Sequence, residues 1–414
     1  MTKNKDSQWQ ISPSIGGLVN ALAPVLRDKG GLWIGWPGTS EQIDLKTLLK
    51  VAGKNTGYTL QPVSLTQDEV TQFYSGFSNE IIWPLFHDFQ SRCNFEPAYW
   101  DIYQAVNRKF AEEIEASSSR DDYIWVHDYH LMLVGRELHN MGIRQKVGFF
   151  LHIPFPPSDI FMKLPWRTQI LRALLEYDLV GFQTIHDRNN FISCVENLIR
   201  GLRCDSRKQV AEITVADRDV QVGVFPISID FDKFARTAVE PAVTEKVKQF
   251  CQAIENCKLI LGVDRLDYSK GIPQKLRAFD NVLGRYPELK GRITLVQIVV
   301  PSRQDIPEYK ELKGEIEGLV SQINGKFSQP GWVPIQYIFR SLEFHDLIAY
   351  YRAADIALVT SLKDGMNLVA KEYCAANVDN NGVLILSEFT GAAAQLKKNS
   401  LLVNPYDIEG VADA

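Results

Sequence analysis

Short runs of β-branched and aromatic residues alternate with amphipathic segments along the whole chain, and this alternation constrains the fold more than any other feature. Between these runs lie segments whose apolar residues recur every three to four positions, such as 18–26 and 170–175, which predicts helices. Nearly continuous apolar strands separated by helices indicate parallel sheets covered on both faces. The sequence therefore predicts an α/β protein. Its expected strands are 31–36, 123–128, 146–155, 179–184, 220–227, 258–265, 293–301, 334–339, 356–361 and 383–389.

The length of 414 residues predicts two domains, because one hydrophobic core rarely serves so long a chain. We expect a boundary after the strand that ends near Ile227, since 228–255 is polar and helix-like and a new series of strands and helices begins at Lys258. We assign 1–240 to an N-terminal domain and 241–414 to a C-terminal domain. Ligands of doubly wound sheets bind beyond the carboxyl ends of the strands, so functional residues are expected where strands give way to loops.

Composition excludes several classes of function. Lys and Arg total 45 against 50 Asp and Glu, a net charge of −5, which gives no basic footprint for nucleic acid and no polybasic run for a membrane surface. The longest apolar stretches, 147–157 and 293–301, are too short to span a bilayer, and the polar first ten residues are unlike a signal peptide. The six scattered cysteines form no CxxC pair, which indicates free thiols in a cytoplasmic protein rather than a disulfide or zinc framework.

Arg265 and Lys270 directly follow an expected strand and precede a helix that begins near Pro273. Two cations with a glycine and a helix start at a strand end form a suitable clamp for a diphosphate. The alternative is that these cations pair with Asp264 or Asp267, which lie beside them in the sequence. Their position at the strand terminus favours phosphate.

The segment SLKDGMNLVAKE, from Ser361, follows another apolar strand. We expect Asp364 and Gly365 to form a turn, and a helix to begin at Asn367. Glu372 would then lie about two turns into the helix, where it could accept hydrogen bonds from two vicinal hydroxyls such as those of a ribose. The alternative is an aspartate that caps the helix and a glutamate in solvent, but the length and context of the segment favour a site.

His152 ends the strand that begins at Lys146, and prolines on both sides of Phe155 fix the loop that follows. This rigid setting favours a site over a satisfied core histidine. A second strand end carries His127, Asp128 and His130, and these groups with His152 invite a metal interpretation. Neighbouring residues of an extended run point to opposite faces, so metal binding is not expected.

Three weaker signals stay open at this level. The glycine pair Gly16-Gly17 precedes a helix and would let backbone amides approach a phosphate, although a tight turn without a ligand is the more common role of such a pair. Tyr74 and Trp83 lie in a helical segment, 67–87, where core packing is the default. Arg303 could hold a phosphate or cap a turn, and composition does not decide between these roles.

Taken together, the motifs resemble those of the trehalose-6-phosphate synthases, which are retaining glycosyltransferases of the GT-B fold. The resemblance runs along essentially the whole chain and implies two facing Rossmann-like domains with parallel sheets and an active-site cleft between them. It rests on GGLVNAL at Gly16, GGLWIGWPG at Gly30, WVHDYHLM at Trp125, HIPFPPSDIF at His152, VDRLDYSKGIPQKL at Val263, PSRQDIPEY at Pro301, SLKDGMNLVAKEY at Ser361, GVLILSEFTGAA at Gly382 and LLVNPYD at Leu401.

The resemblance implies transfer of glucose from UDP-glucose to the anomeric hydroxyl of glucose 6-phosphate, giving α,α-trehalose 6-phosphate and UDP. It implies that Arg265 and Lys270 bind the donor diphosphate and that His152 and Asp364 bind the transferred glucose. No cofactor and no metal is implied, the partners are the two small-molecule substrates, and a homo-oligomer is a further expectation. The implied nucleotide-sugar site also contains Gly17, Leu342, Leu368, Val369, Ala370, Lys371 and Glu372, and the implied acceptor site contains Tyr74, Trp83, Asp128 and Arg303.

The chain departs from the family at both ends. The family opens with a strand and a Ser-Asn-Arg turn, and we expect that strand and the family's terminal helices to be missing here. Two alternatives follow: a glucosylglycerol-phosphate synthase, which uses another acceptor, and a catalytically silent sugar-phosphate sensor. The incomplete ends favour the sensor, whereas Arg265, Lys270, Asp364 and Glu372 oppose it.

Overall fold

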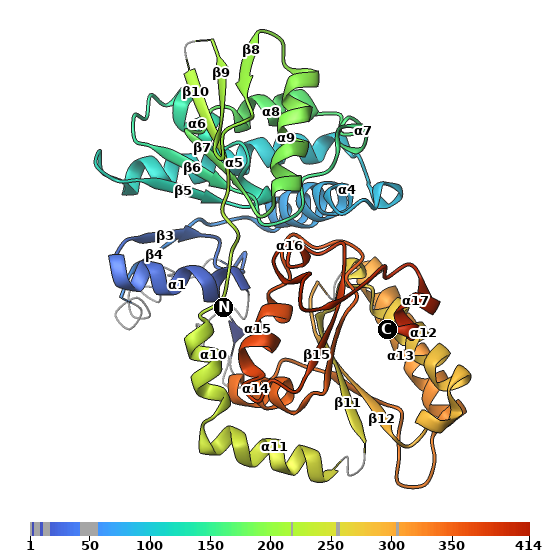
Figure 1. The fold of residues 1–414 in the computed structure, drawn as a ribbon. Coiled ribbons are helices and arrows are strands. Elements are labelled where there is room, and N and C mark those ends of the chain that lie inside the picture. Colours follow the sequence, from blue (N-terminus) through green and yellow to red (C-terminus); the bar gives the residue numbers. More distant parts are fainter. Residues whose placement is uncertain are drawn as a thin grey trace. The chain divides into compact units, whose positions relative to one another are not determined.

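The computed structural model describes residues 2–3, 9–10, 17–41, 57–216, 218–253, 257–303 and 306–414 (Figure 1). The chain divides into two compact units, Met1–Ile227 and Ser228–Ala414. Helix α10 (Phe231–Ala238) packs on α14 (Phe344–Ala353) and α15 (Leu368–Ala376) of the second unit. The division between the units therefore lies before α10, and not at residue 240.

The second unit is built on a parallel six-stranded sheet of order β13-β12-β11-β14-β15-β16. The order reverses between β11 and β14, which is where doubly wound sheets bind ligands. Five of the six strands were expected from the sequence; β16 has only three residues. The strands are β11 (Lys258–Arg265), β12 (Ile293–Val300), β13 (Ile335–Phe339), β14 (Ile356–Val359), β15 (Val383–Ser387) and β16 (Leu401–Val403).

Helices cover both faces of this sheet, as near-continuous apolar strands require (Figure 1). A buried cluster that includes Ala278, Leu358 and Val411 joins the sheet to the helices on one face. The helices of this unit after α10 are α11 (Pro241–Ala253), the 3₁₀ turns η4 (Tyr268–Lys270) and η5 (Pro287–Leu289), α12 (Ile272–Arg285), α13 (Pro307–Phe327), α14, α15, α16 (Ala393–Leu396) and α17 (Ile408–Asp413).

The main sheet of the first unit has the order β5-β6-β7-β10-β9-β8. Its first four strands are parallel and were expected: β5 (Ile124–His127), β6 (Val147–Phe150), β7 (Leu179–Phe182) and β10 (Arg218–Val224). Two further strands, β9 (Ala211–Val215) and β8 (Leu202–Asp205), extend the sheet in antiparallel fashion. They were not expected: both are short, and the sequence of β8, LRCD, resembles a loop. The helices of this sheet are α5 (Pro97–Ser117), η3 (Tyr129–Leu131), α6 (Val134–Asn140), α7 (Ser158–Phe161), α8 (Arg167–Leu174) and α9 (Ile185–Leu198).

Smaller elements precede this sheet. The expected strand 31–36 is β3 (Leu32–Gly35), which follows helix α1 (Gly17–Lys29) in the chain. It pairs in parallel with β4 (Thr59–Pro62). A two-residue antiparallel pair joins β1 (Thr2–Lys3) and β2 (Trp9–Gln10).

The expected helix 67–87 is a composite helical run. It begins as α3 (Gln67–Glu69), continues as the π-helix η1 (Val70–Ile82), ends as α4 (Trp83–Phe86) and is followed by the 3₁₀ turn η2 (Gln90–Arg92). Thr66 caps it in a reciprocal capping box with Glu69. The π-winding changes which side chains share a face of this run.

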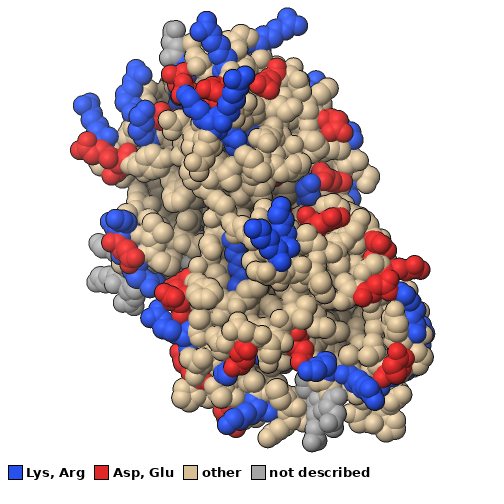
Figure 2. Space-filling model, in the orientation of Figure 1, with Lys and Arg blue, Asp and Glu red and all other residues tan. Residues whose placement is uncertain are grey.

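Lys and Arg side chains are interspersed with Asp and Glu on the face shown in Figure 2, as the nearly balanced charge predicts. Among the residues that the structure describes, no helix is both long enough and apolar enough to span a membrane.

Candidate active site

The loops that follow β11 and β14 are joined by backbone contacts at the carboxyl edge of the second sheet. The Leu362 amide donates to the Ser269 carbonyl at 2.7 Å. Gly271 immediately precedes α12 and has φ +63°, and a Cβ at this position would lie 2.2 Å from the Thr360 carbonyl oxygen. Only glycine therefore permits the close approach of the two loops that carry Lys270 and Asp364.

Lys270 and Asp364 form an ion pair, with the Lys270 Nζ 2.6 Å from the Asp364 Oδ2, and each side chain is 13% exposed. Asn367 Nδ2 donates to the same carboxylate oxygen at 3.1 Å, and Ser361 Oγ does so at 3.3 Å. Two residues predicted separately thus form one polar cluster that still reaches the surface. Such low exposure strengthens its electrostatic interactions.

Asn367, and not Asp364, caps helix α15. Its backbone has φ +71°, and its Oδ1 accepts from the Ala370 amide at 3.0 Å. The helix begins at Leu368, so its first amides lie beside the Lys270–Asp364 pair and can bind an anion there. The alternative interpretation of Asp364 as the helix cap is therefore wrong.

Glu372 lies in α15 and is half-buried, in contrast to the alternative of a solvated glutamate. Its Oε2 accepts a hydrogen bond from the Tyr351 hydroxyl at 2.7 Å. Burial raises the pKa of the Glu372 carboxyl, and the hydrogen bond from Tyr351 opposes that rise. Its other oxygen has no partner among the described residues and is available to a hydroxyl.

The remaining predicted nucleotide-site residues of the second unit lie at the same sheet edge. Leu342 follows β13, and Leu368 and Val369 open α15 with partly exposed side chains. Ala370 is fully buried, and burial lowers the pKa of Lys371.

Arg265, the last residue of β11, and Arg303, which follows β12, share one buried carboxylate. Asp267 Oδ2 lies 3.3 Å from the Arg265 Nη2 and 3.5 Å from the Arg303 Nη1. The Asp267 side chain is fully buried, whereas that of Arg265 is 43% exposed. The alternative ion pair with Asp267 is thus present, but a guanidinium has five donors and can bind a phosphate as well.

Asp264, the other candidate partner, is engaged elsewhere. Its Oδ2 lies 2.6 Å from the Lys275 Nζ, and both side chains are buried. It therefore does not compete for Arg265 or Lys270.

In the first unit, aromatic rings link Tyr74 to Trp83. The Tyr74 ring stacks on His130 with centroids 5.6 Å apart and an interplanar angle of 9°. His130 lies 4.0 Å from the ring of Tyr129, whose own centroid is 5.8 Å from that of Trp83. Both aromatics thus contact the loop after β5, although Trp83 is only 5% exposed and is mainly a core residue.

Asp128 and His152 meet at the carboxyl ends of the adjacent strands β5 and β6. Asp128 has φ +72°, a conformation that L-residues other than Asn and Asp seldom adopt, and its Oδ1 accepts from the His152 amide at 3.3 Å. The structure therefore places Tyr74, Trp83, Asp128 and His152 around one loop.

The His152 ring is held at both nitrogens. Its Nε2 lies 3.0 Å from the His127 Nδ1, and its Nδ1 lies 3.5 Å from the Gln183 Nε2. Gln183 Oε1 accepts from the Ile227 amide at 2.8 Å, which fixes its Nε2 as a donor. His152 Nδ1 is then the acceptor, and its Nε2–H donates to His127.

Burial keeps both histidines neutral. It lowers the pKa of His127 to about 4 and that of His152 to about 3, and the charge that His127 would carry contributes to the second shift. Neither ring titrates near neutral pH.

Three contacts of the candidate site were not foreseen from the sequence: Arg303 with Asp267, Gln183 with His152, and the His127–His152 pair. The adjacency of β5 and β6 creates the histidine pair, and the only signal for it was a histidine at each strand end. Gly17 opens α1, no described interaction links it to the other candidate residues, and Gly16 lies outside the described residues. Across the described part of the chain, no three His, Cys, Asp or Glu side chains converge as metal ligands.

The cluster beyond the carboxyl edge of the second sheet combines two cations, a helix start and a carboxylate suited to vicinal hydroxyls. It lies where doubly wound sheets bind their ligands. The model of glycosyltransferase family 20 matches residues 1–414, and the chain belongs to that family.

An individual relative is consistent with membership in glycosyltransferase family 20. The α,α-trehalose-phosphate synthase (UDP-forming) A of Dictyostelium discoideum is 41% identical over 413 residues, which cover 100% of this chain and 55% of that protein. The chain thus spans about half the length of this relative.

Solved structures are also similar. An E. coli structure bound with UDP-2-fluoro glucose is 38% identical with a TM-score of 0.89, over 98% of this chain and 88% of that one. A Burkholderia xenovorans α,α-trehalose-phosphate synthase in complex with glucose-6-phosphate is 34% identical with a TM-score of 0.88, over 97% and 88% of the two chains. The predicted family and the predicted GT-B fold are confirmed.

Proposed function

We propose that this glycosyltransferase moves glucose from UDP-glucose to the anomeric hydroxyl of glucose 6-phosphate, giving α,α-trehalose 6-phosphate and UDP. The observation that carries the proposal is the Lys270–Asp364 pair beside Arg265 and the start of α15. This cluster offers cations and backbone amides to a diphosphate, and a carboxylate to the sugar hydroxyls. The relatives that bind UDP-2-fluoro glucose and glucose-6-phosphate support the choice of substrates.

The donor is assigned mainly to the second unit. Arg265 and Lys270 bind the diphosphate, and Asp364 accepts from hydroxyls of the transferred glucose. Glu372 accepts from the ribose hydroxyls through the oxygen that Tyr351 leaves unoccupied. The segment 368–371 and Leu342 are assigned to the nucleotide site, and Gly17 is assigned to the donor phosphates.

The acceptor is assigned to Tyr74, Trp83 and Asp128, with Arg303 as the cation for its phosphate. The aromatic rings and the Asp128 carboxylate suit the apolar and hydroxyl faces of a hexose. His152 binds the transferred glucose in the orientation that His127 and Gln183 fix.

The proposed transfer proceeds on one face of the donor sugar. The bond from the anomeric carbon to the diphosphate oxygen breaks, and the acceptor oxygen forms its bond from the same side, so configuration is retained. The acceptor proton moves to the departing diphosphate oxygen. This route needs no protein nucleophile, and the residues contribute by positioning the substrates and by stabilising the charge on the leaving group.

The test is release of UDP from UDP-glucose with glucose 6-phosphate as acceptor, and with glycerol 3-phosphate in a parallel assay. We expect UDP and α,α-trehalose 6-phosphate in equal amounts when glucose 6-phosphate is the acceptor, and no UDP release with glycerol 3-phosphate. UDP release only with glycerol 3-phosphate would support the glucosylglycerol-phosphate synthase. Calorimetric binding of UDP-glucose without UDP release in either assay would support the silent sensor.

We further propose that the reaction needs no metal ion and that the enzyme works in the reducing cytoplasm. All six cysteines are free in the structure, which suits that compartment. Activity should survive extensive chelation unchanged, and a loss that added Mg²⁺ restores would contradict the first proposal. A homo-oligomer stays a prediction, to be measured by sedimentation.

A further inference from the structure

A buried tyrosine, Tyr351, holds one oxygen of the Glu372 carboxylate. Tyr351 belongs to α14 and Glu372 to α15, and the Tyr351 hydroxyl donates to the Glu372 Oε2 at 2.7 Å. Tyr351 is 1% exposed, whereas Glu372 is half-buried. Because a closely packed ring has little freedom to move, its hydroxyl is a donor in a fixed position. The hydrogen bond therefore fixes the orientation of the carboxylate.

The protonation states of the two groups support this arrangement. Burial raises the pKa of the Tyr351 phenol well above its ordinary value of 10.0, and the charge of Glu372 raises it further. Tyr351 therefore keeps its proton at neutral pH and remains a donor. Burial also raises the pKa of Glu372, and the hydrogen bond from Tyr351 opposes that rise. A neutral phenol thus stabilises the charged form of the carboxylate.

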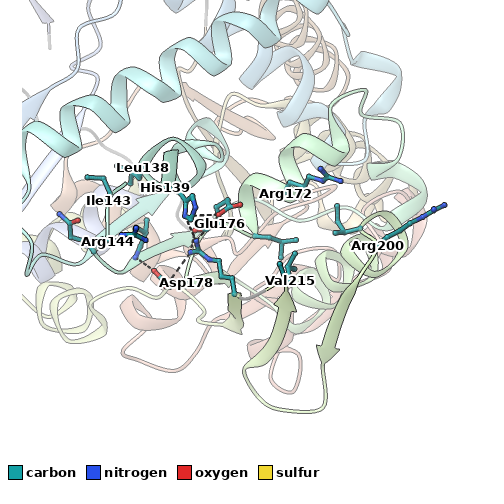
Figure 3. Close-up of a pocket in the computed structure, with 16 residues that line it drawn as sticks. Leu138, His139, Ile143, Arg144, Arg172, Glu176, Asp178, Arg200 and Val215 are labelled. Atoms are coloured by element: carbon teal, nitrogen blue, oxygen red, sulfur yellow. Dashed lines mark hydrogen bonds and ion pairs between the residues drawn. The ribbon is translucent and has the colours of Figure 1, made fainter. Parts of the chain in front are cut away.

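Glu372 differs from carboxylates whose role is structural. Figure 3 shows two of these, Glu176 and Asp178, at a pocket of about 710 Å³ in the first unit. Glu176 lies 3.2 Å from an Arg218 nitrogen and Asp178 lies 3.1 Å from the Lys146 Nζ, so cations compensate both. Among the described residues, no cation forms an ion pair with Glu372. Its charge is therefore left for a ligand that carries hydroxyl donors.

An alternative role for Tyr351 is to join α14 to α15. That junction has another buried tyrosine, Tyr373, which follows Glu372 in α15 and is 2% exposed. Its hydroxyl donates to the carbonyl of Ala354, directly after α14, at 3.2 Å. A junction between helices can thus be made through a backbone carbonyl. It needs no carboxylate, whose burial is unfavourable.

We propose that Tyr351 is a positioning residue through which Glu372 selects a ribonucleotide over a deoxyribonucleotide. This role rests on the proposed function, in which Glu372 accepts from the ribose hydroxyls. With Oε2 held by Tyr351, the carboxylate meets the hydroxyls in one orientation and loses little conformational freedom when the nucleotide binds. A ligand without these hydroxyls leaves the half-buried charge with fewer hydrogen bonds, which lowers its affinity.

The test compares the Kd of UDP with the Kd of dideoxy-UDP, which lacks both ribose hydroxyls, by calorimetry on the full chain. The two ligands share the base and the diphosphate, so the ratio of their Kd values measures the contribution of the ribose hydroxyls. Y351F removes the phenol oxygen and keeps the ring. The matched control is Y373F, which removes a buried hydroxyl of the same helix pair whose hydrogen bond goes to Ala354 and not to Glu372. E372Q removes the charge.

We expect the unaltered chain to bind UDP at least about tenfold more tightly than dideoxy-UDP, since hydrogen bonds to a charged group are strong. Y351F should lower this ratio at least about threefold by weakening the binding of UDP. Its affinity for dideoxy-UDP should change little, which also shows that the variant is folded. Y373F should keep the full ratio. The ratio in Y351F/E372Q should equal that in E372Q, because Tyr351 acts through the Glu372 charge.

Equal binding of the two ligands by the unaltered chain, or an unchanged ratio in E372Q, would refute the ribose role of Glu372 in the proposed function and the role of Tyr351 with it. A ratio that E372Q lowers and Y351F retains would overturn the role of Tyr351 alone. Falls of the same size in Y351F and Y373F would also overturn it, since helix packing would then explain both. A lower ratio in Y351F/E372Q than in E372Q would show that Tyr351 acts without Glu372.

Discussion

His127 Nδ1 lies 3.0 Å from His152 Nε2, and the two rings meet at the carboxyl ends of adjacent parallel strands. Gln183, at the end of the next strand, holds the opposite nitrogen of His152. His127 and Gln183 therefore fix the tautomer and the orientation of His152 before any ligand binds. Such pre-organisation is valuable where a neutral imidazole must meet a sugar hydroxyl in one geometry.

Removal of the His127 acceptor should release the His152 ring. We expect H127L to lower kcat/KM for UDP-glucose by about tenfold, because a lost orienting contact misplaces a substrate-binding group. H127N carries Oδ1 at the position of the histidine Nδ1 and should retain most of the activity. KM for glucose 6-phosphate should change little in both variants. Equal losses in H127L and H127N would show that the hydrogen bond is not what matters.

The histidine pair should also make the first unit sensitive to acid. The ordinary histidine pKa is 6.5, whereas burial holds His127 at about 4 and His152 at about 3 in the folded chain. Below about pH 6.5, His127 and His152 bind protons in the unfolded chain but stay neutral in the folded chain. The free energy of unfolding therefore falls as pH decreases towards 4, by up to about 1.4 kcal/mol per pH unit for each histidine.

Urea unfolding at several values between about pH 4 and pH 6.5 measures this slope. H127L removes one of the two groups, so its slope should be shallower than that of the unaltered chain by up to about 1.4 kcal/mol per pH unit. Parallel slopes for the two proteins would mean that His127 does not resist protonation in the folded state.

Gly271 tests the junction between the loops after β11 and β14. In G271A the new methyl group would lie 2.2 Å from the Thr360 carbonyl oxygen, on a backbone with φ +63°, so the loops must separate. We expect a loss of roughly 1–3 kcal/mol in the free energy of unfolding, and weaker binding of UDP as Lys270 and Asp364 move apart. Thermal unfolding and UDP titration measure the two effects.

Gly284 in α12, the helix that Gly271 precedes, is the matched control, because a Cβ there meets nothing within 4 Å. G284A should be neutral or stabilising by up to about 1 kcal/mol, with UDP affinity unchanged. If G271A behaved like G284A, the close approach at Thr360 would not be needed.

Arg265 tests the stabilisation of the leaving group. We expect R265A to lower kcat by about a hundredfold or more, since the lost cation acts where charge develops. KM for glucose 6-phosphate should change little. R277A, which breaks an exposed pair with Glu315 in the same unit, should leave both parameters unchanged. Near-normal turnover in R265A would refute the diphosphate role.

The sequence predicted the parallel strands well because burial on both faces leaves them almost wholly apolar. Strand β12, ITLVQIVV, is buried along seven of its eight residues. By contrast, β8, LRCD, lies at a sheet edge and alternates between half-buried and exposed residues, so hydropathy does not separate it from a loop. The π-winding of 70–82 depends on hydrogen bonds that residue types do not specify.

The candidate site was predictable to the extent that it follows strand ends. Arg265 is the last residue of β11, and Asp364 lies in the loop after β14, so the rule for doubly wound sheets identified their position. The partners of these residues were not predictable, because pairs such as Lys270–Asp364 depend on which strands become neighbours. The roles of the individual residues stay predictions.

The shared, water-excluded Asp267 limits how this enzyme can be altered. Because the Asp267 carboxylate is buried, water cannot compensate its charge when one of its two guanidinium partners is removed. Replacement of Arg303 would remove one of the positive charges that compensate Asp267 and would so change the electrostatics at Arg265. A substitution at either arginine therefore also changes the environment of the buried Asp267 that the two share.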